Sequence, residues 1–159
     1  MHNDGVELLL STAGMGDGVR AVRHFRFREV VVRGHIEAEL AANHSHASQI
    51  GEHRFVLHGG LSSKVNHSCE PNCGISVNLT GAHDLVARRD IEPGEQISFD
   101  YAMRNHTVDH FTESCQCGHP DCRGLITGWK DLPAQRKTDY TGFIAPYLLD
   151  IDTRLTSPR

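Results

Sequence analysis

The chain contains 159 residues, 16 of them Lys or Arg and 20 Asp or Glu, which gives a formal net charge of −4 at neutral pH. This length predicts one domain, large enough to bury a core. The apolar content is that of an ordinary globular protein, and wholly apolar runs reach only three residues, as in 8–10 and 30–32. These features exclude a disordered, a collagen-like and a membrane-spanning chain.

The charged residues form no basic block, which argues against direct nucleic-acid binding, whose footprint is a clustered positive face. A modest negative charge is compatible with a cationic partner. We expect no secretory signal and no membrane association, because no basic segment precedes an apolar one near residue 1. An intracellular protein is therefore expected, cytoplasmic in a bacterium and nuclear in a eukaryote or a virus, with the oligomeric state left open.

Short runs that favour β-strands, broken by glycine, follow one another through the first two-thirds of the chain. In order, we expect strands within residues 6–10, 19–25, 29–36, 53–57, 75–79, 85–88 and 96–101. A glycine-rich turn is expected at 14–18, and Pro93 with Gly94 predicts a second turn at 92–95. The sequence therefore predicts a mostly β fold rather than a helical bundle.

The last thirty residues differ in character from the rest of the chain. Asp131 is a candidate N-cap for a helix that has Pro133 in its first turn, and Gly142 interrupts the pattern. An apolar segment at 143–151 follows, with Pro146 near its start. Since so short a segment has too little core to fold alone, we expect this tail to pack on the β part.

The cysteines give the strongest local signal. Cys115, Cys117 and Cys122 lie close together in a segment that contains glycine and proline, so their thiols can converge on one ion. Structural zinc takes four ligands, and the fourth thiol has to come from Cys69 or Cys73. Reduced, unligated thiols and disulfides are the alternatives. An odd number of cysteines without a secretory signal favours a metal site over disulfides.

Three further patterns remain open on spacing alone. Residues 66–73 contain Asn-His-Ser-Cys, which also occurs as an ordinary turn. Residues 94–101 combine a turn with a strand, in which Tyr101 could equally be a core side chain. The glycines of 16–18 permit close approach of a ligand to the backbone, although Gly-x-Gly mostly marks turns.

Taken together and in this order, these stretches resemble the SET-domain family of S-adenosylmethionine-dependent lysine methyltransferases that carry a C-terminal post-SET zinc-binding motif. The matching stretches are the Gly-x-Gly-Val-x-Ala of 16–21, the Asn-His-Ser-Cys-x-Pro-Asn of 66–72, the closing motif of 86–101 and the cysteine motif of 115–124. The three later motifs are highly specific, and the resemblance covers roughly residues 5–128.

The resemblance implies a β-clip-like fold of small sheets with a pseudoknot, in which the closing motif passes beside the Asn-His-Ser-Cys segment. It implies a SET domain at 5–104, with a minimal variable insert at about 37–60, a post-SET zinc module at 112–128 and a helical tail at 129–159. The cofactors would be S-adenosylmethionine and one structural zinc ion, the latter bound by Cys69, Cys115, Cys117 and Cys122, which leaves Cys73 free.

The resemblance also assigns site residues. S-adenosylmethionine would contact Met15, Gly16, Asp17, Gly18, Asn66, His67, Tyr101 and Leu125. Ile126 or Trp129 could share the role of Leu125 or belong to the core. Tyr101 would be the active-site tyrosine that orients the acceptor amine. Phe99 would occupy the Phe/Tyr switch position, and because Phe has no hydroxyl to hold a water there, we expect di- or trimethylation to be allowed.

The sequence also departs from the family pattern. Residues 64–65 are Lys-Val where the family has Arg-Phe, and the extra channel tyrosines are missing before residue 66. His53, Phe55 or His58 could line that wall, or belong to an ordinary strand, and Tyr147 could reach the channel or pack in the core. The methyl acceptor, a protein lysine or a small-molecule amine, is therefore the least constrained feature.

We consider three functions on this basis. The first is a protein-lysine N-methyltransferase, the second a related enzyme that acts on a non-protein amine, and the third a non-catalytic SET-like interaction module. Intact Asn66, His67 and Tyr101 together with four candidate zinc thiols favour an enzyme over the interaction module.

Overall fold

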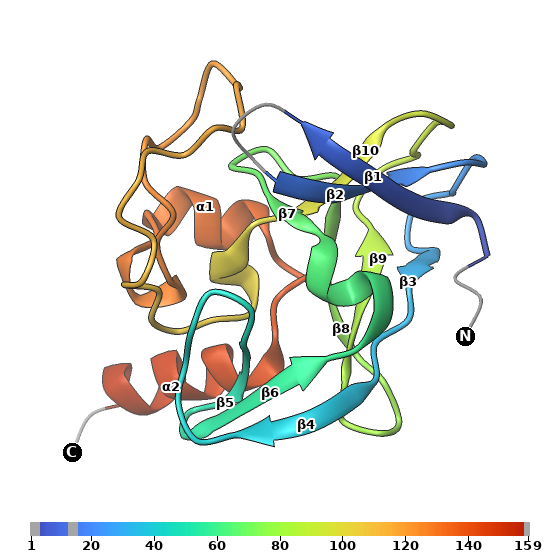
Figure 1. The fold of residues 1–159 in the computed structure, drawn as a ribbon. Helices are drawn as coiled ribbons and strands as arrows, with labels where there is room; N and C mark the ends of the chain where they lie inside the picture. Colours follow the sequence, from blue (N-terminus) through green and yellow to red (C-terminus); the bar gives the residue numbers. More distant parts are fainter. Residues whose placement is uncertain (1–3, 13–15, 158–159) are drawn as a thin grey trace.

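The computed structural model describes residues 4–12 and 16–157, and within them the strands form three small sheets (Figure 1). The first sheet has the order β1-β2-β10-β7, built from β1 (Val6–Thr12), β2 (Gly16–Ala21), β10 (Gln96–Phe99) and β7 (Asn66–His67). The second has the order β3-β9-β8, from β3 (Val30–Val32), β9 (His83–Ala87) and β8 (Cys73–Val77).

The third sheet, of order β4-β6-β5, consists of β4 (Ile36–Leu40), β6 (Arg54–His58) and β5 (Ser48–Gly51). It forms one edge of the molecule, where α2 lies beside β5 (Figure 1). This sheet contains most of residues 37–60, the segment expected to be the minimal variable insert, which is therefore regular antiparallel structure.

Short helices connect the sheets and close the chain. Three of them are 3₁₀ helices: η1 (Gly60–Lys64), η2 (Tyr101–Met103) and η3 (Trp129–Asp131). The tail contributes α1 (Ala134–Asp139) and α2 (Pro146–Thr156), with Pro146 in the first turn of α2. Among the described residues, none of these helices has the length and apolar content needed to cross a bilayer.

One strand pair carries the topology that matters for the site. β10 is antiparallel to β2 on one side and parallel to β7 on the other, so Phe99 lies next to His67 in register. The Asn72 side chain accepts a hydrogen bond from the Ser98 amide at 3.0 Å and donates one to the Gln96 carbonyl at 2.8 Å. The closing motif was expected to pass beside the Asn-His-Ser-Cys segment, and the structure confirms this.

The core joins strands and tail. Val19, Phe25 and Ile97 from the β part are fully buried together with Tyr140 and Leu148 from the tail. Backbone hydrogen bonds fasten the tail at several points, for example from the Ile75 amide to the Phe143 carbonyl at 2.9 Å. The expected mostly β fold with a short helical tail is confirmed, and the tail shares the core of the β part.

One local prediction is wrong and another is wrong in part. Of the turn expected at 14–18, Gly16 and Gly18 lie inside β2, whereas 14 and 15 lie outside the described residues. Asp131 does not cap α1, because it ends the 3₁₀ helix η3, and Pro133 precedes α1 without a side-chain cap. The turn at 92–95 is confirmed, with Gly94 at φ 92°, a conformation that glycine adopts without strain.

Candidate active site and metal centre

Four cysteines from two distant segments meet in one cluster. The sulfur atoms of Cys69, Cys115, Cys117 and Cys122 all lie within 4.8 Å of one another. The Cys69 sulfur is 3.9 Å from that of Cys115 and 4.0 Å from that of Cys122. A tetrahedral zinc site with Zn–S bonds near 2.3 Å has sulfur–sulfur edges of about 3.8 Å, so the cluster has the size and donor set of a structural zinc site.

The surroundings of the thiols disfavour their joint ionisation unless a cation lies among them. Burial raises the pKa of the Cys69 thiol to about 11 and also raises the pKa of Cys115. Burial opposes ionisation of Cys117 as well, but hydrogen bonds to its sulfur lower its pKa to about 7. Four neighbouring thiolates repel one another, and a divalent cation removes that repulsion while it favours the deprotonated ligands. The fifth thiol, Cys73, is fully buried in β8 outside the cluster.

A large cavity adjoins these cysteines and has a volume of about 370 Å³. Asn66, His67 and Tyr101 line one side of it, and the loop of residues 110–116 together with Ile126 lines the other. A volume of this size lies at the lower end of that of small-molecule sites. Three of the predicted site residues are thus brought together in one cavity, directly beside the cysteine cluster.

His67 links the cavity to the cysteines. Its Nδ1 accepts a hydrogen bond from the Tyr101 amide at 3.1 Å, so Nε2 carries the ring hydrogen and faces the Cys69 sulfur at 3.5 Å. Burial lowers the pKa of His67 to about 4, and this effect outweighs the carboxylate of Asp100, which lies 3.6 Å from Nδ1. The imidazole is therefore neutral at neutral pH, with its tautomer fixed by its two neighbours.

Tyr101 begins the 3₁₀ helix that follows β10, and its ring is packed by other rings. The centroids of Phe99, His67 and Phe111 lie 5.0, 5.2 and 5.7 Å from that of Tyr101. The hydroxyl donates to the Val65 carbonyl at 3.0 Å, which leaves its oxygen lone pairs for an external donor. Burial raises the pKa of Tyr101 to about 12, so the side chain is a neutral phenol at neutral pH.

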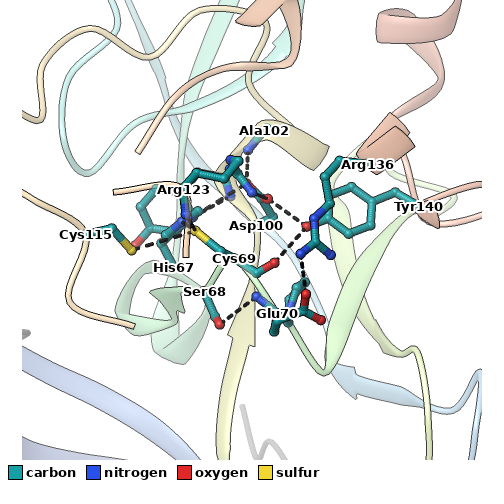
Figure 2. Close-up of polar contacts among 12 residues, drawn as sticks. His67, Ser68, Cys69, Glu70, Asp100, Ala102, Cys115, Arg123, Arg136 and Tyr140 are labelled. Atoms are coloured by element: carbon teal, nitrogen blue, oxygen red, sulfur yellow. Dashed lines mark hydrogen bonds and ion pairs between the residues drawn. The ribbon is translucent and has the colours of Figure 1, made fainter. Parts of the chain in front are cut away.

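A buried carboxylate, Asp100, joins three parts of the chain (Figure 2). It receives hydrogen bonds from both terminal nitrogens of Arg123 at 2.7 and 3.0 Å, from the Tyr140 hydroxyl at 2.8 Å and from the Ala102 amide at 3.0 Å. Arg123 directly follows Cys122, and Tyr140 ends α1. Asp100 therefore holds the cysteine loop and the tail against the segment between β10 and η2, next to Tyr101.

The remaining predicted site residues lie as follows. Met15 lies outside the described residues. Asp17 accepts a hydrogen bond at its backbone oxygen from the Asn66 side chain at 3.2 Å, and a Cβ on Gly18 would come within 2.9 Å of that same amide. Phe99 is 1% exposed. Leu125 is 53% exposed and does not line the large cavity, which Ile126 does.

Several residues of this region were missed by the sequence analysis. Asp100 and Arg123 stand inside recognised motifs, next to Tyr101 and Cys122, and their positions were the available signal for a buried ion pair. His110 and Phe111 line the large cavity, and nothing in their local sequence indicated it. His53, Phe55 and His58, considered as residues of the channel wall, do not line it.

Comparisons with known proteins agree with this geometry. The family model described as SET domain matches residues 16–102, more than half of the chain. The chain is 44% identical over 103 residues to histone-lysine N-methyltransferase ash1 of Drosophila melanogaster, an alignment that covers 52% of this chain and 4% of the relative.

Two fungal proteins are also similar. The H3 lysine-36 specific histone-lysine N-methyltransferase of Mycosarcoma maydis is 34% identical over 87 residues, covering 53% of this chain and 8% of the relative. The H3 lysine-4 specific histone-lysine N-methyltransferase of Saccharomyces cerevisiae is 32% identical over 71 residues, covering 43% of this chain and 7% of the relative. The chain spans less than a tenth of the length of these three relatives. The family model matches more than half of the chain, β7 pairs with β10, and the Asn-His-Ser-Cys segment lies beside Tyr101. The chain therefore belongs to the SET domain family.

Proposed function

We propose that the chain is an S-adenosylmethionine-dependent N-methyltransferase that acts on lysine side chains of proteins. The single observation that carries this proposal is the convergence of Asn66, His67 and Tyr101 on one cavity of about 370 Å³ beside the cysteine cluster. The names of the similar proteins support a protein-lysine acceptor, and more specifically a histone.

The residues present fit the cofactor in chemistry and in space. Asn66 and His67 supply polar groups on the cavity wall, and Ile126 supplies an apolar one. The missing side chain of Gly18 leaves room next to the Asn66 amide. We assign Gly16, Asp17, Gly18, Asn66 and His67 to cofactor binding, together with Met15, Tyr101 and Leu125 from the family resemblance. When bound, S-adenosylmethionine supplies a methyl group on a positively charged sulfur.

The chemistry required of the protein is mostly positioning. The acceptor amine must be neutral to form the new C–N bond as the C–S bond breaks, and a lysine ammonium has an ordinary pKa near 10.4. Because Tyr101 is a neutral phenol, it is not the base, and the proton leaves to water. Its hydroxyl, held by the Val65 carbonyl, orients the amine through its free lone pairs.

Phe99 shapes the acceptor end of the site. Its ring lies 5.0 Å from the Tyr101 ring and carries no hydroxyl, so it holds no ordered water that an added methyl group would have to displace. We therefore propose that the enzyme can add a second and a third methyl group. Monomethyllysine as the only product, in mass spectrometry of a reaction run to completion, would contradict this part.

The domain assignment is part of the proposal. Residues 5–104 form the SET domain, 112–128 the zinc module and 129–159 the tail. One structural zinc ion would be held by Cys69, Cys115, Cys117 and Cys122, where it would fix the loop that forms one wall of the cavity. This metal has a structural role, because four thiolates leave no open position for a substrate.

The test uses the zinc-replete chain with methyl-labelled S-adenosylmethionine and recombinant histone H3, with free lysine and a polyamine in parallel reactions. We expect label on histone lysines. Tyr101→Phe should reduce turnover by about 100-fold while largely preserving cofactor affinity. The matched control is Tyr147→Phe, since the Tyr147 hydroxyl contacts only the backbone of Arg104 and His106, and it should stay within a few-fold of wild type. Absence of cofactor binding would refute the proposal, and label on free amines alone would change the acceptor class.

A further inference from the structure

A second, smaller cavity also borders Tyr101. Its volume is about 20 Å³, enough for a group the size of one or two water molecules. Tyr101, His110 and Phe111 line both cavities, so the small cavity adjoins the predicted site of methyl transfer. Serines from residues 45–48 and 62–63 line it together with Arg104, and its lining contains no Asp or Glu.

Arg104 is the unusual member of this lining. The residue is 7% exposed, and its guanidinium stacks over the Phe99 ring with 4.6 Å between the guanidinium carbon and the ring centroid. Among the described residues, the guanidinium has no carboxylate partner and no hydrogen-bond acceptor, and its Nε is buried without a partner. Burial lowers the pKa of Arg104 to about 10, so the group is still a cation at neutral pH. A buried cation without a counter-charge is costly.

Two serine hydroxyls add donors to the same cavity. The His58 Nε2 accepts a hydrogen bond from the His83 amide at 3.0 Å, so its Nδ1 carries the hydrogen and donates to the Ser48 hydroxyl at 2.8 Å. Ser48 therefore receives one hydrogen bond and keeps its own hydrogen for another acceptor. Ser62 is 3% exposed, and its hydroxyl has no partner in the part of the chain described.

We propose that Arg104, Ser48 and Ser62 form a subsite for a carboxylate of the methyl-accepting substrate. This inference rests on the proposed function, because it places an Asp or Glu side chain next to the target lysine. An arginine and two hydroxyls are donors that match a carboxylate, and no acid of the chain competes for them in the cavity. The small volume favours a carboxylate over the larger phosphate group.

The placement also defines how close the two groups of the substrate lie. Consecutive residues of an extended peptide advance about 3.3–3.6 Å. A carboxylate in the small cavity and an amine at the Tyr101 hydroxyl both lie beside Tyr101, and side chains two positions apart in an extended peptide share one face, so we place the acid two positions from the lysine. Substrate preference would thus be determined by a residue that the family resemblance does not include.

The first test measures kcat/KM for lysine peptides in which each flanking position carries Glu or its uncharged counterpart Gln. Wild type should prefer Glu over Gln at one position by about tenfold, the effect of a charge-assisted hydrogen bond. Arg104→Met replaces the guanidinium by an unbranched apolar side chain and should abolish the preference, so that the Glu and Gln peptides have equal kcat/KM. The control is Arg26→Gln, an exposed arginine outside both cavities, which should keep the preference.

A second test does not depend on methyl transfer. Sodium formate is titrated at constant ionic strength while the Nε–H resonance of Arg104 is followed by NMR. A saturable shift that is weakened in Ser62→Ala and unaffected in Arg26→Gln supports the subsite. No saturable shift, or an equal response of Ser62→Ala, overturns it.

The outcomes separate the two proposals. If no peptide is methylated although formate binds at Arg104, the subsite stands and the proposed acceptor is wrong. If peptides are methylated without any Glu preference, the subsite is wrong and the function stands. If Arg104→Met shifts the pH–rate profile to higher pH with no change in flanking preference, Arg104 acts on the acceptor amine instead, and the subsite is likewise overturned.

Discussion

The two buried arginines beside Tyr101 differ in how their charge is satisfied. Arg123 meets Asp100 through two hydrogen bonds, and although burial alone would lower its pKa, this pairing raises it. Arg104, which is more deeply buried, meets no acid among the described residues, and burial lowers its pKa. The Nε of each lacks a partner, so the difference lies in the terminal nitrogens. The paired arginine has a structural role, whereas the unpaired one is a candidate for contact with a ligand.

On the Arg123 side, we expect the zinc-bound cysteine cluster to stabilise the loop of residues 112–128 most strongly. Removing it should therefore cause the largest loss of structure. Zinc binding by cysteine sites is worth roughly 10–16 kcal/mol in peptides. Cys117→Ser, or treatment with a chelator, should release the metal and remove amide protection from residues 112–128 in hydrogen exchange, with a loss of cofactor affinity. Metal analysis gives the stoichiometry.

A matched thiol provides the control for this experiment. Cys73→Ala removes a buried cysteine that does not belong to the cluster, so the variant should retain one zinc per chain. A wild-type protein without zinc, or a Cys73→Ala variant that loses it, would contradict the assignment of the four ligands.

Asp100→Asn tests the paired side of the comparison directly. The substitution leaves the Arg123 charge buried without its counter-charge, and breaking such a pair by removing one partner costs about 3–5 kcal/mol. Urea unfolding measures the loss. Glu52→Gln breaks the exposed pair with Arg154 and should cost under about 1 kcal/mol. Equal losses in the two variants would mean that Asp100 does not hold the loop and the tail together.

The sequence predicted the parts of the site that lie within short motifs. The Asn-His-Ser-Cys segment and the three clustered cysteines could be identified because donor type and spacing are local properties. The role of Asp100 could not, because its partners Arg123 and Tyr140 follow it by 23 and 40 residues and meet it only after the loop and α1 have folded back. The small cavity was missed for the same reason, since Ser48, Ser62 and Arg104 share no motif.

The local errors have similar causes. The glycines at 16 and 18 indicate a turn by type, but pairing of β2 with both β1 and β10 keeps them in a strand. The helix start was expected at Asp131 because an acid before proline is a good cap. A 3₁₀ turn intervenes there, fixed by the hydrogen bond from the Trp129 amide to the Asn105 carbonyl at 2.8 Å. In both cases tertiary contacts outweigh local preference.

Tyr140→Phe removes one of the bonds to Asp100 and leaves the arginine pair intact. Because the hydroxyl donates to a buried carboxylate at 2.8 Å, the variant should lose about 1.5–3 kcal/mol in free energy of unfolding. Zinc content should be unchanged, since the tail supplies no ligand. The same hydroxyl also lies 3.3 Å from the Cys69 carbonyl, so loss of zinc in this variant would show that this contact is needed to hold the metal site.

Near Arg104, the buried neutral side chain of His58 should make a smaller contribution to the free energy of unfolding, and this contribution should depend on pH. Burial lowers the pKa of His58 to about 3, with a contribution from the Arg104 charge, against an ordinary value near 6.5 in the unfolded chain. The unfolded state therefore binds a proton first, so stability is full above about pH 6.5 and falls as the pH drops toward 3. Between pH 7 and pH 6, the His58 contribution falls by roughly 0.7 kcal/mol. His58→Gln, which cannot titrate, should show a pH dependence shallower by that amount. An unchanged slope would mean that His58 has the same pKa in the folded and the unfolded protein, so that neither burial nor the charge of Arg104 lowers it.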